Sequence, residues 1–462
     1  MTIVKESCLV LVLDLSTERA TAAPEDRLPE AECSSKLPNL DDVLMELRSK
    51  TDRSRLNATH LLLSCCRVKL NNENIANIRR LCEKPVDWKL LAEAAAIHGL
   101  TPLLYWNLKA VAADVIPGAV LQDLAESFMN DANRSVILAQ ELANLLSVCL
   151  QNEIQCIPFK GPQLALMCYG NLTLRSTSDL DILVRKSDVV NVHRLLLNRG
   201  YTPCNWRNTH KFSDDFFLSG QFVNFCSAYA YSNQEGIVVD LHWQILPSTF
   251  LALSPDYMFS HLQQGFFQGK PIETFDNELL LFFLCAHASK HGWYRLNWIV
   301  DIAELLDLMQ SADWQSLLER SRKIGAEKMV LLGAYLTTYL PRTSLPKEMS
   351  DRIEAEPEIR ALGDEIINRM LANPTFTEWN DLKRRTHYLR MKKTYLQRFA
   401  LFLELATKPT LDERMRLPLP SSLFPLYYGL RLLNLFVDHI PRITSRFLWS
   451  GYDRRTSAEF GP

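Results

Sequence analysis

One stretch, residues 154–184, constrains the fold most because it reads as strand, turn, helix, loop and second strand in close succession. The apolar run Ile154–Phe159 predicts a short buried strand. It ends at Lys160-Gly161-Pro162, where glycine permits a sharp turn and proline suits the first position of a helix. A small apolar helix is predicted over Leu164–Tyr169, and Gly170 ends it.

The second strand of this unit carries two carboxylates, Asp179 and Asp181. Side chains alternate along a strand, so these two aspartates point the same way while Leu180 and Ile182 point into the core. Neighbouring carboxylates repel each other unless a cation compensates them. A divalent metal ion is one such cation, and an arginine such as the nearby Arg175 is another.

A third carboxylate, Asp240, lies on a later strand, and it would join the pair if that strand lies beside the first. Two strands, Phe222–Tyr231 and Ile237–Trp243, are predicted to form a hairpin around Asn233–Gly236. On the second of them Asp240 and His242 share one face, so His242 is either a partner of the carboxylates or an ordinary polar strand residue. Three aspartates on adjacent strands suit Mg²⁺ or Mn²⁺, which prefer oxygen ligands.

A simpler interpretation remains open for these residues. An isolated Asp-x-Asp triplet is common, and Asp179 and Asp181 then form a solvated strand end with Asp240 on the surface. The residues around the triplet favour the metal site.

Those surroundings resemble the family of uncharacterised nucleotidyltransferases, which is part of the DNA-polymerase-beta-like nucleotidyltransferase superfamily. The resemblance covers roughly residues 85–310. The matching residues are Lys160-Gly161, Tyr169, Arg175, Asp179–Val184, the helix Val189–Arg199 with Gly200-Tyr201, Asp240–Trp243, His287 to Leu296, and Asp301. Most members of the wider superfamily carry Gly-Ser at the turn, where this chain has Lys160-Gly161.

The resemblance implies an α+β fold in which a small mixed-sheet nucleotidyltransferase core is embedded in extensive helical flanking regions. It implies transfer of a nucleoside monophosphate from a nucleoside triphosphate, expected to be ATP, to a hydroxyl of an acceptor that the sequence does not identify. The catalytic and metal-binding residues would be Asp179, Asp181 and Asp240, with Mg²⁺ or Mn²⁺. The nucleotide phosphates would be bound by Lys160, Gly161, Arg175 and Lys290. The alternative is a noncatalytic member of the same fold that binds a nucleotide or a partner.

Composition and charge bear on the nucleic-acid-binding, disulfide-bonded and zinc-binding classes of protein. The 462 residues carry a net charge of −2, so a broadly basic surface for nucleic acid is not expected. The eleven cysteines form no Cys-x-x-Cys pair, which favours free thiols and a cytoplasmic protein. Within a helix predicted over Asn277–Leu308, His287 and His291 are spaced for zinc, but no third ligand is evident.

The chain divides by pattern into five regions. Their predicted extents are 1–39, a disordered leader; 40–153, helical; 154–250, the α/β core; 251–410, helical; and 411–462, a tail rich in proline, aromatic residues and arginine. In the tail, Leu423–Val437 is expected to lie in the core, and contact with a membrane surface or a partner is the alternative.

Overall fold

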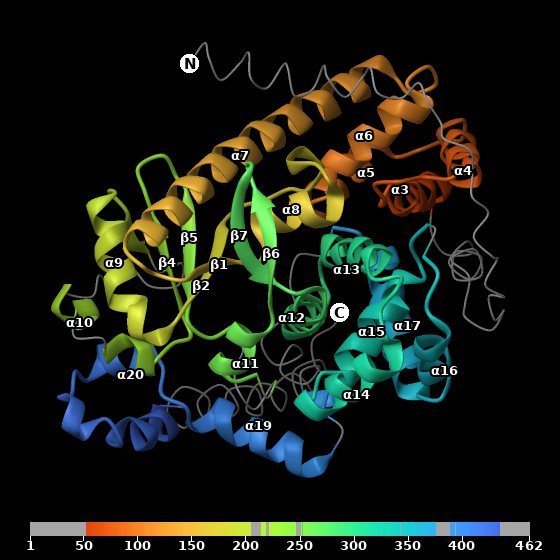
Figure 1. Ribbon diagram of the computed structural model, residues 1–462. Helices are drawn as coiled ribbons and strands as arrows, with labels where there is room; N and C mark the ends of the chain where they lie inside the picture. The colour runs from red at the N-terminus through yellow and green to blue at the C-terminus, as the bar shows by residue number, and fades with distance from the viewer. Residues whose placement is uncertain are drawn as a thin grey trace, which may run out of the picture.

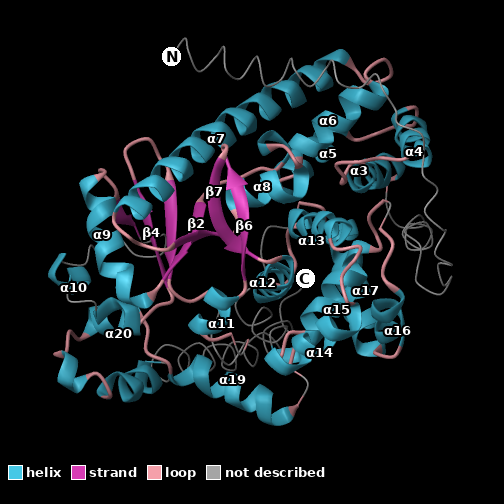
Figure 2. Cartoon of the chain, viewed as in Figure 1, coloured by secondary structure: helices cyan, strands magenta, loops and turns pink. Residues whose placement is uncertain are grey.

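The computed structural model describes residues 52–204, 214–218, 221–245, 251, 253–341, 343–375, 389–392 and 394–434. Helices surround a small mixed β-sheet, which confirms the predicted α+β fold class (Figures 1 and 2). The predicted leader, residues 1–39, lies outside the described residues, and so do the end of the tail and part of the region before it.

Among the described residues, five helices precede the sheet. Asp87 caps the helix α5, because its carboxylate accepts a hydrogen bond from the Leu90 N–H, and Gly99 ends the same helix in the left-handed conformation. Figure 1 shows the long helix α7 running across the sheet from the other helices of this region. These helices are α3 (Arg53–Ser64), α4 (Asn72–Cys82), α5 (Trp88–His98), α6 (Thr101–Ala112) and α7 (Gly118–Gln151).

The sheet has five strands in the order β1-β2-β5-β4-β3, with bounds β1 (Cys156–Pro158), β2 (Leu180–Val184), β3 (Thr202–Cys204), β4 (Ala228–Ser232) and β5 (Val238–His242). Strands β2 and β5 pair in parallel, and the other neighbours pair antiparallel. Between β1 and β2 lies the predicted helix, α8 (Gly161–Tyr169).

The predicted hairpin forms, but its first strand is shorter than expected. Residues Gln221–Asn224 are a 3₁₀ helix, η4, and only Ala228–Ser232 pairs with β5. The aromatic residues that suggested a strand instead fill the core, where Phe222 stacks edge-on against Trp243 and Phe217. Burial of aromatic rings suits either conformation, so composition alone did not distinguish them.

The two faces of the sheet have different surroundings. Leu180, Ile182 and Val184 of β2 belong to one core cluster with Leu138 and Leu142 of α7. The helix α9 (Val189–Asn198) contributes to the same cluster. The opposite face carries Asp181, Asp240 and His242, and next to them it carries Leu183, which belongs to the other core cluster.

Beyond β5 the chain forms helices and one additional hairpin. The single helix predicted over Asn277–Leu308 is wrong, because the chain breaks at Gly292 and Trp293, whose φ angles are +68° and +56°. The fully buried Trp293 side chain explains the break, since a continuous helix would point it elsewhere. The elements are α11 (Pro255–Ser260), β6 (Leu262–Phe267), β7 (Lys270–Phe275), α12 (Asn277–Lys290), α13 (Leu296–Leu308), α14 (Trp314–Ile324), α15 (Glu327–Thr337), α16 (Lys347–Glu354) and α17 (Pro357–Ala372).

The last described segment contains α19 (Tyr395–Thr407), α20 (Leu411–Arg416), η5 (Ser421–Leu423) and a helical stretch at 426–434. The prediction that Leu423–Val437 lies in the core is only partly right for its described residues. Tyr427 is buried, whereas Leu426, Tyr428 and Leu433 are exposed. Among the described residues, no helix is both long and apolar enough to cross a membrane.

Candidate functional site

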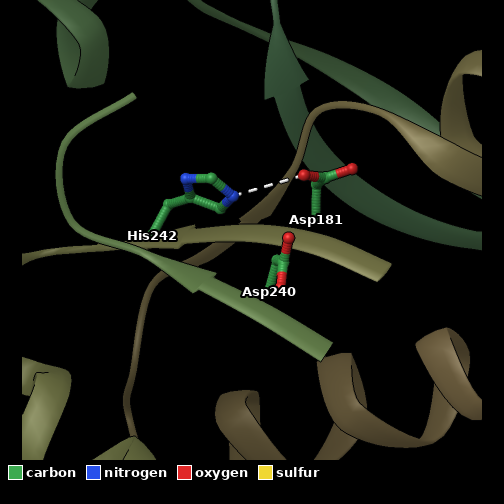
Figure 3. Close-up of side chains that lie close together, drawn as sticks. All are labelled: Asp181, Asp240 and His242. Carbon is green, nitrogen blue, oxygen red and sulfur yellow. Dashed lines mark hydrogen bonds and ion pairs between the residues drawn. The ribbon is translucent and has the colours of Figure 1, made fainter. Parts of the chain in front are cut away.

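The parallel pairing of β2 with β5 places Asp181 directly beside Asp240. Leu180 and Ile182 are anchored in the core on one side of β2, so the alternation of the strand turns Asp181 to the other side. On β5, His242 follows Asp240 on the same face. Figure 3 shows the two carboxylates side by side with the His242 ring directed at Asp181.

The three side chains form a group that fits a divalent metal ion. Their ligand atoms all lie within 4.8 Å of one another. The Nε2 atom of His242 lies 3.2 Å from Oδ1 of Asp181. The other oxygen of Asp181, Oδ2, is buried and accepts no hydrogen bond, and the cation that compensates it in this structure is the ammonium group of Lys160, 3.5 Å away. Two carboxylates and an imidazole are common ligands of divalent ions.

The two carboxylates differ in their electrostatic environment. Burial, and then the negative charge of Asp181, raises the pKa of Asp240 to about 6. Burial acts in the same direction on Asp181, but Lys160 and the hydrogen bond with His242 outweigh it and hold the pKa of Asp181 well below its usual range. Asp181 is therefore the compensated carboxylate and Asp240 the uncompensated one.

Lys160 comes to the site from the turn between β1 and α8. Its Nζ atom lies 3.5 Å from Oδ2 of Asp181, and its side chain is only 14% exposed. Burial lowers the pKa of Lys160, but the charges of Asp181 and Asp179 outweigh this effect and raise it. The ammonium group is therefore a permanent positive charge inside the site.

Gly161 shapes the same turn. Its φ angle is +59°, and a Cβ atom added there would lie 3.1 Å from the carbonyl oxygen of Asp179. The absence of a side chain thus lets the turn approach the start of β2 closely.

Asp179 lies just before β2 and is partly exposed. Its carboxylate accepts a hydrogen bond from Ser178 Oγ at 3.0 Å, and it is not among the three grouped ligands. Its charge still contributes to the raised pKa of Asp240. Arg134 of α7 holds the backbone next to it, because its Nη2 donates to the carbonyl oxygens of Ser178 and Gly236.

Arg175 is buried, and its guanidinium group binds a carboxylate of the protein itself. Its Nε and Nη2 atoms donate to the two oxygens of the buried Asp301, at 2.8 and 2.9 Å. Tyr169 donates to the same carboxylate at 2.7 Å. These contacts tie the loop before β2 to α13, so Arg175 supports the site from within the protein.

Lys290 is exposed at the end of α12, close to a cluster of rings formed by His287, His291 and Trp298. Burial, followed by the charge of Lys160, lowers the pKa of His287 well below its usual range. His287 is therefore a neutral neighbour of Lys160. In the sequence His287 stands out for its spacing from His291 and as the first residue of the stretch that resembles the family, and no local pattern indicates its place beside Lys160.

Comparison with known proteins gives a family but few individual relatives. The sequence profile of a family described as uncharacterised nucleotidyltransferase matches residues 84–340. A search of curated proteins finds no match. Among solved structures, the chain is similar to an antigenic nucleotidyltransferase-like protein from Paracoccidioides brasiliensis. The match has 17% identity and a TM-score of 0.26, and it covers 44% of this chain and 94% of that one.

Proposed function

The chain belongs to the uncharacterised nucleotidyltransferase family, and we propose that it transfers a nucleotidyl group from a nucleoside triphosphate to a hydroxyl of an acceptor. The observation that carries the proposal is the register of β2 and β5, which sets Asp181 beside Asp240 on one face of the sheet. The site residues are Asp181 and Asp240, with Asp179 at its edge.

Each residue has a role that follows from its surroundings. Asp181 and Asp240, together with His242, would hold a divalent ion, Mg²⁺ or Mn²⁺, which would supply positive charge to the phosphates. Lys160 would donate hydrogen bonds to phosphate oxygens, as an ammonium group does. Gly161 keeps the turn close to β2, and Lys290 would neutralise charge at the rim.

The reaction is an in-line displacement at the α-phosphorus. The acceptor oxygen forms a bond to phosphorus, the bond to the oxygen that bridges the α- and β-phosphates breaks, and pyrophosphate leaves. Asp240 lies on the same face of the sheet as Asp181, and it would accept the hydroxyl proton as the general base.

An alternative function has one specific observation in its favour. The carboxylate of Asp181 already has Lys160 and His242 as partners. A noncatalytic protein that binds a nucleotide or a partner would need this carboxylate to be compensated by its own side chains. The two functions differ in one respect: only the enzyme releases pyrophosphate.

Thermal unfolding with Mn²⁺ and each nucleoside triphosphate tests the proposal without knowledge of the acceptor. A ligand at 100 times its Kd stabilises the folded state by about 2.7 kcal/mol. We expect this stabilisation in the wild type, and its loss in Asp181→Asn and Asp240→Asn. The matched control is Asp256→Asn, which removes an exposed carboxylate of α11 and should behave as the wild type.

Pyrophosphate release then separates the two functions. Release that depends on Mn²⁺ and on Asp240, with water or added hydroxyl compounds as acceptors, supports the enzyme. Nucleotide-dependent stabilisation with no release under any of these conditions would support the noncatalytic alternative. Failure of every nucleotide to stabilise a cooperatively folded wild type would contradict both.

A further inference from the structure

Lys160 brings a positive charge next to the carboxylate of Asp181. Its ammonium group is 3.5 Å from Asp181 Oδ2 and mostly shielded from solvent. The turn that carries it is set by Gly161 and by the packing of β1 against β2. The charge therefore belongs to the framework of the site.

The charges around Lys160 suggest how many metal ions the site can hold. Asp179, Asp181 and Asp240 contribute three negative charges, and Lys160 contributes one positive charge. The remaining two negative charges match a single divalent ion. The described residues contain one group of three ligands that could hold a metal ion, and Asp179 is not in it.

We propose that this site binds one divalent ion, and that Lys160 serves as a built-in cation in place of a second ion. This inference rests on the proposed function, since it assumes that the carboxylates bind metal. In the absence of nucleotide the ammonium group pairs with Asp181. When a triphosphate is bound, the same group would contact its oxygens, and the single ion would remain with Asp181, Asp240 and His242.

Two opposite effects of Lys160 follow. Its positive charge repels a metal ion a few ångströms away, so it weakens metal binding. The same charge attracts a triphosphate, so it strengthens nucleotide binding. If Lys160 had only a structural role, its replacement would not strengthen metal binding and weaken nucleotide binding at the same time.

Binding of Mn²⁺ alone to the full chain, followed by electron paramagnetic resonance, tests the inference. We expect one Mn²⁺ in the wild type. In Lys160→Met we expect binding at least tenfold tighter or a second bound ion, together with at least tenfold weaker ATP binding. Lys160→Arg should resemble the wild type. The control is Lys270→Met on β7, where the lysine contacts Ser147, and it should change neither property.

The outcomes separate this inference from the proposed function. Two Mn²⁺ ions in the wild type, or unchanged or weaker Mn²⁺ binding in Lys160→Met, would overturn the inference and leave the metal centre intact. If the wild type binds no Mn²⁺, the metal centre itself is refuted, and the inference with it. Circular dichroism establishes that each variant is folded, and Lys160→Gln replaces Lys160→Met if the latter does not fold.

Discussion

Arg175 and Asp301, 126 residues apart in the sequence, form a buried ion pair joined by two hydrogen bonds. The Asp301 carboxylate is fully buried and Arg175 is only 5% exposed. Tyr169 donates a third hydrogen bond to the same carboxylate. The pair connects the loop before β2 with α13, so the position of β2 depends on a helix far along the chain.

Asp301→Asn should destabilise the protein strongly because it leaves the Arg175 charge buried without a counterion. Breaking a buried pair in this way costs about 3–5 kcal/mol. Urea denaturation measures the loss. The matched control is Asp114→Asn, which breaks the exposed pair with Arg79 and should cost about 0–1 kcal/mol. Equal losses in the two variants would show that the buried pair has no special role.

Asp240→Asn should stabilise the metal-free protein, although it removes a proposed catalytic group. Burial and the charge of Asp181 raise the pKa of Asp240 to about 6, so its ionised form is unfavourable in the fold near neutral pH. Removing that charge should gain about 1–3 kcal/mol at pH 7.5. Asp181→Asn should have the opposite effect, because it leaves Lys160 unpaired. Denaturation in the presence of EDTA compares the two, and a change of the same sign in both would contradict this account.

A comparison of Gly161→Ala with Gly170→Ala distinguishes the free-energy cost of an unfavourable backbone conformation from the cost of a steric clash. Both glycines have positive φ angles, +59° and +66°, so each substitution costs about 1–2 kcal/mol from conformation alone. Only at Gly161 would the new Cβ lie 3.1 Å from the Asp179 carbonyl oxygen. We therefore expect Gly161→Ala to cost more and also to weaken Mn²⁺ binding, measured by calorimetry. Equal effects at both positions would mean that the close approach to Asp179 is unimportant.

His98 should make the protein sensitive to mild acid. Burial lowers its pKa to about 4, and its Nδ1 accepts a hydrogen bond from the Leu296 N–H at 3.2 Å. The unfolded chain binds a proton near pH 6.5 and the folded chain does not, so the stability contributed by the neutral ring is present above pH 6.5 and is lost as the pH falls toward 4. The loss between pH 7.5 and pH 5 should be about 2 kcal/mol.

His98→Asn is the test of that pH dependence. The Asn side-chain oxygen can accept the Leu296 hydrogen bond without titrating. Urea denaturation at the two pH values should show a smaller loss in the variant than in the wild type, by about 2 kcal/mol. An identical loss in both proteins would assign the acid sensitivity to other groups.

Local patterns in the sequence were sufficient for several features. The turn at Lys160-Gly161 and the helix α8 follow from chemistry that acts within a few residues. Alternation along β5 also placed Asp240 and His242 on one face, and the resemblance to the nucleotidyltransferase family was confirmed.

Features that join distant segments were beyond those patterns. The sequence did not show that Arg175 would pair with Asp301, that His287 would lie near Lys160, or that the helix after Asn277 would break at Gly292. Each of these features depends on which distant side chains the packing brings together. A buried charge needs a counterion, and the local sequence does not indicate which residue supplies it.

The sequence by itself determined the acidic residues, the face of each strand on which they lie and the turn that carries Lys160, because the period of a strand and the geometry of a glycine turn are local properties. Tertiary structure alone decided that β2 pairs in parallel with β5 and that Asp181 lies beside Asp240. It also decided that Lys160 reaches Asp181. Strand pairing depends on burying the apolar faces of segments that are far apart in the chain, and the carboxylates meet as a consequence of that burial.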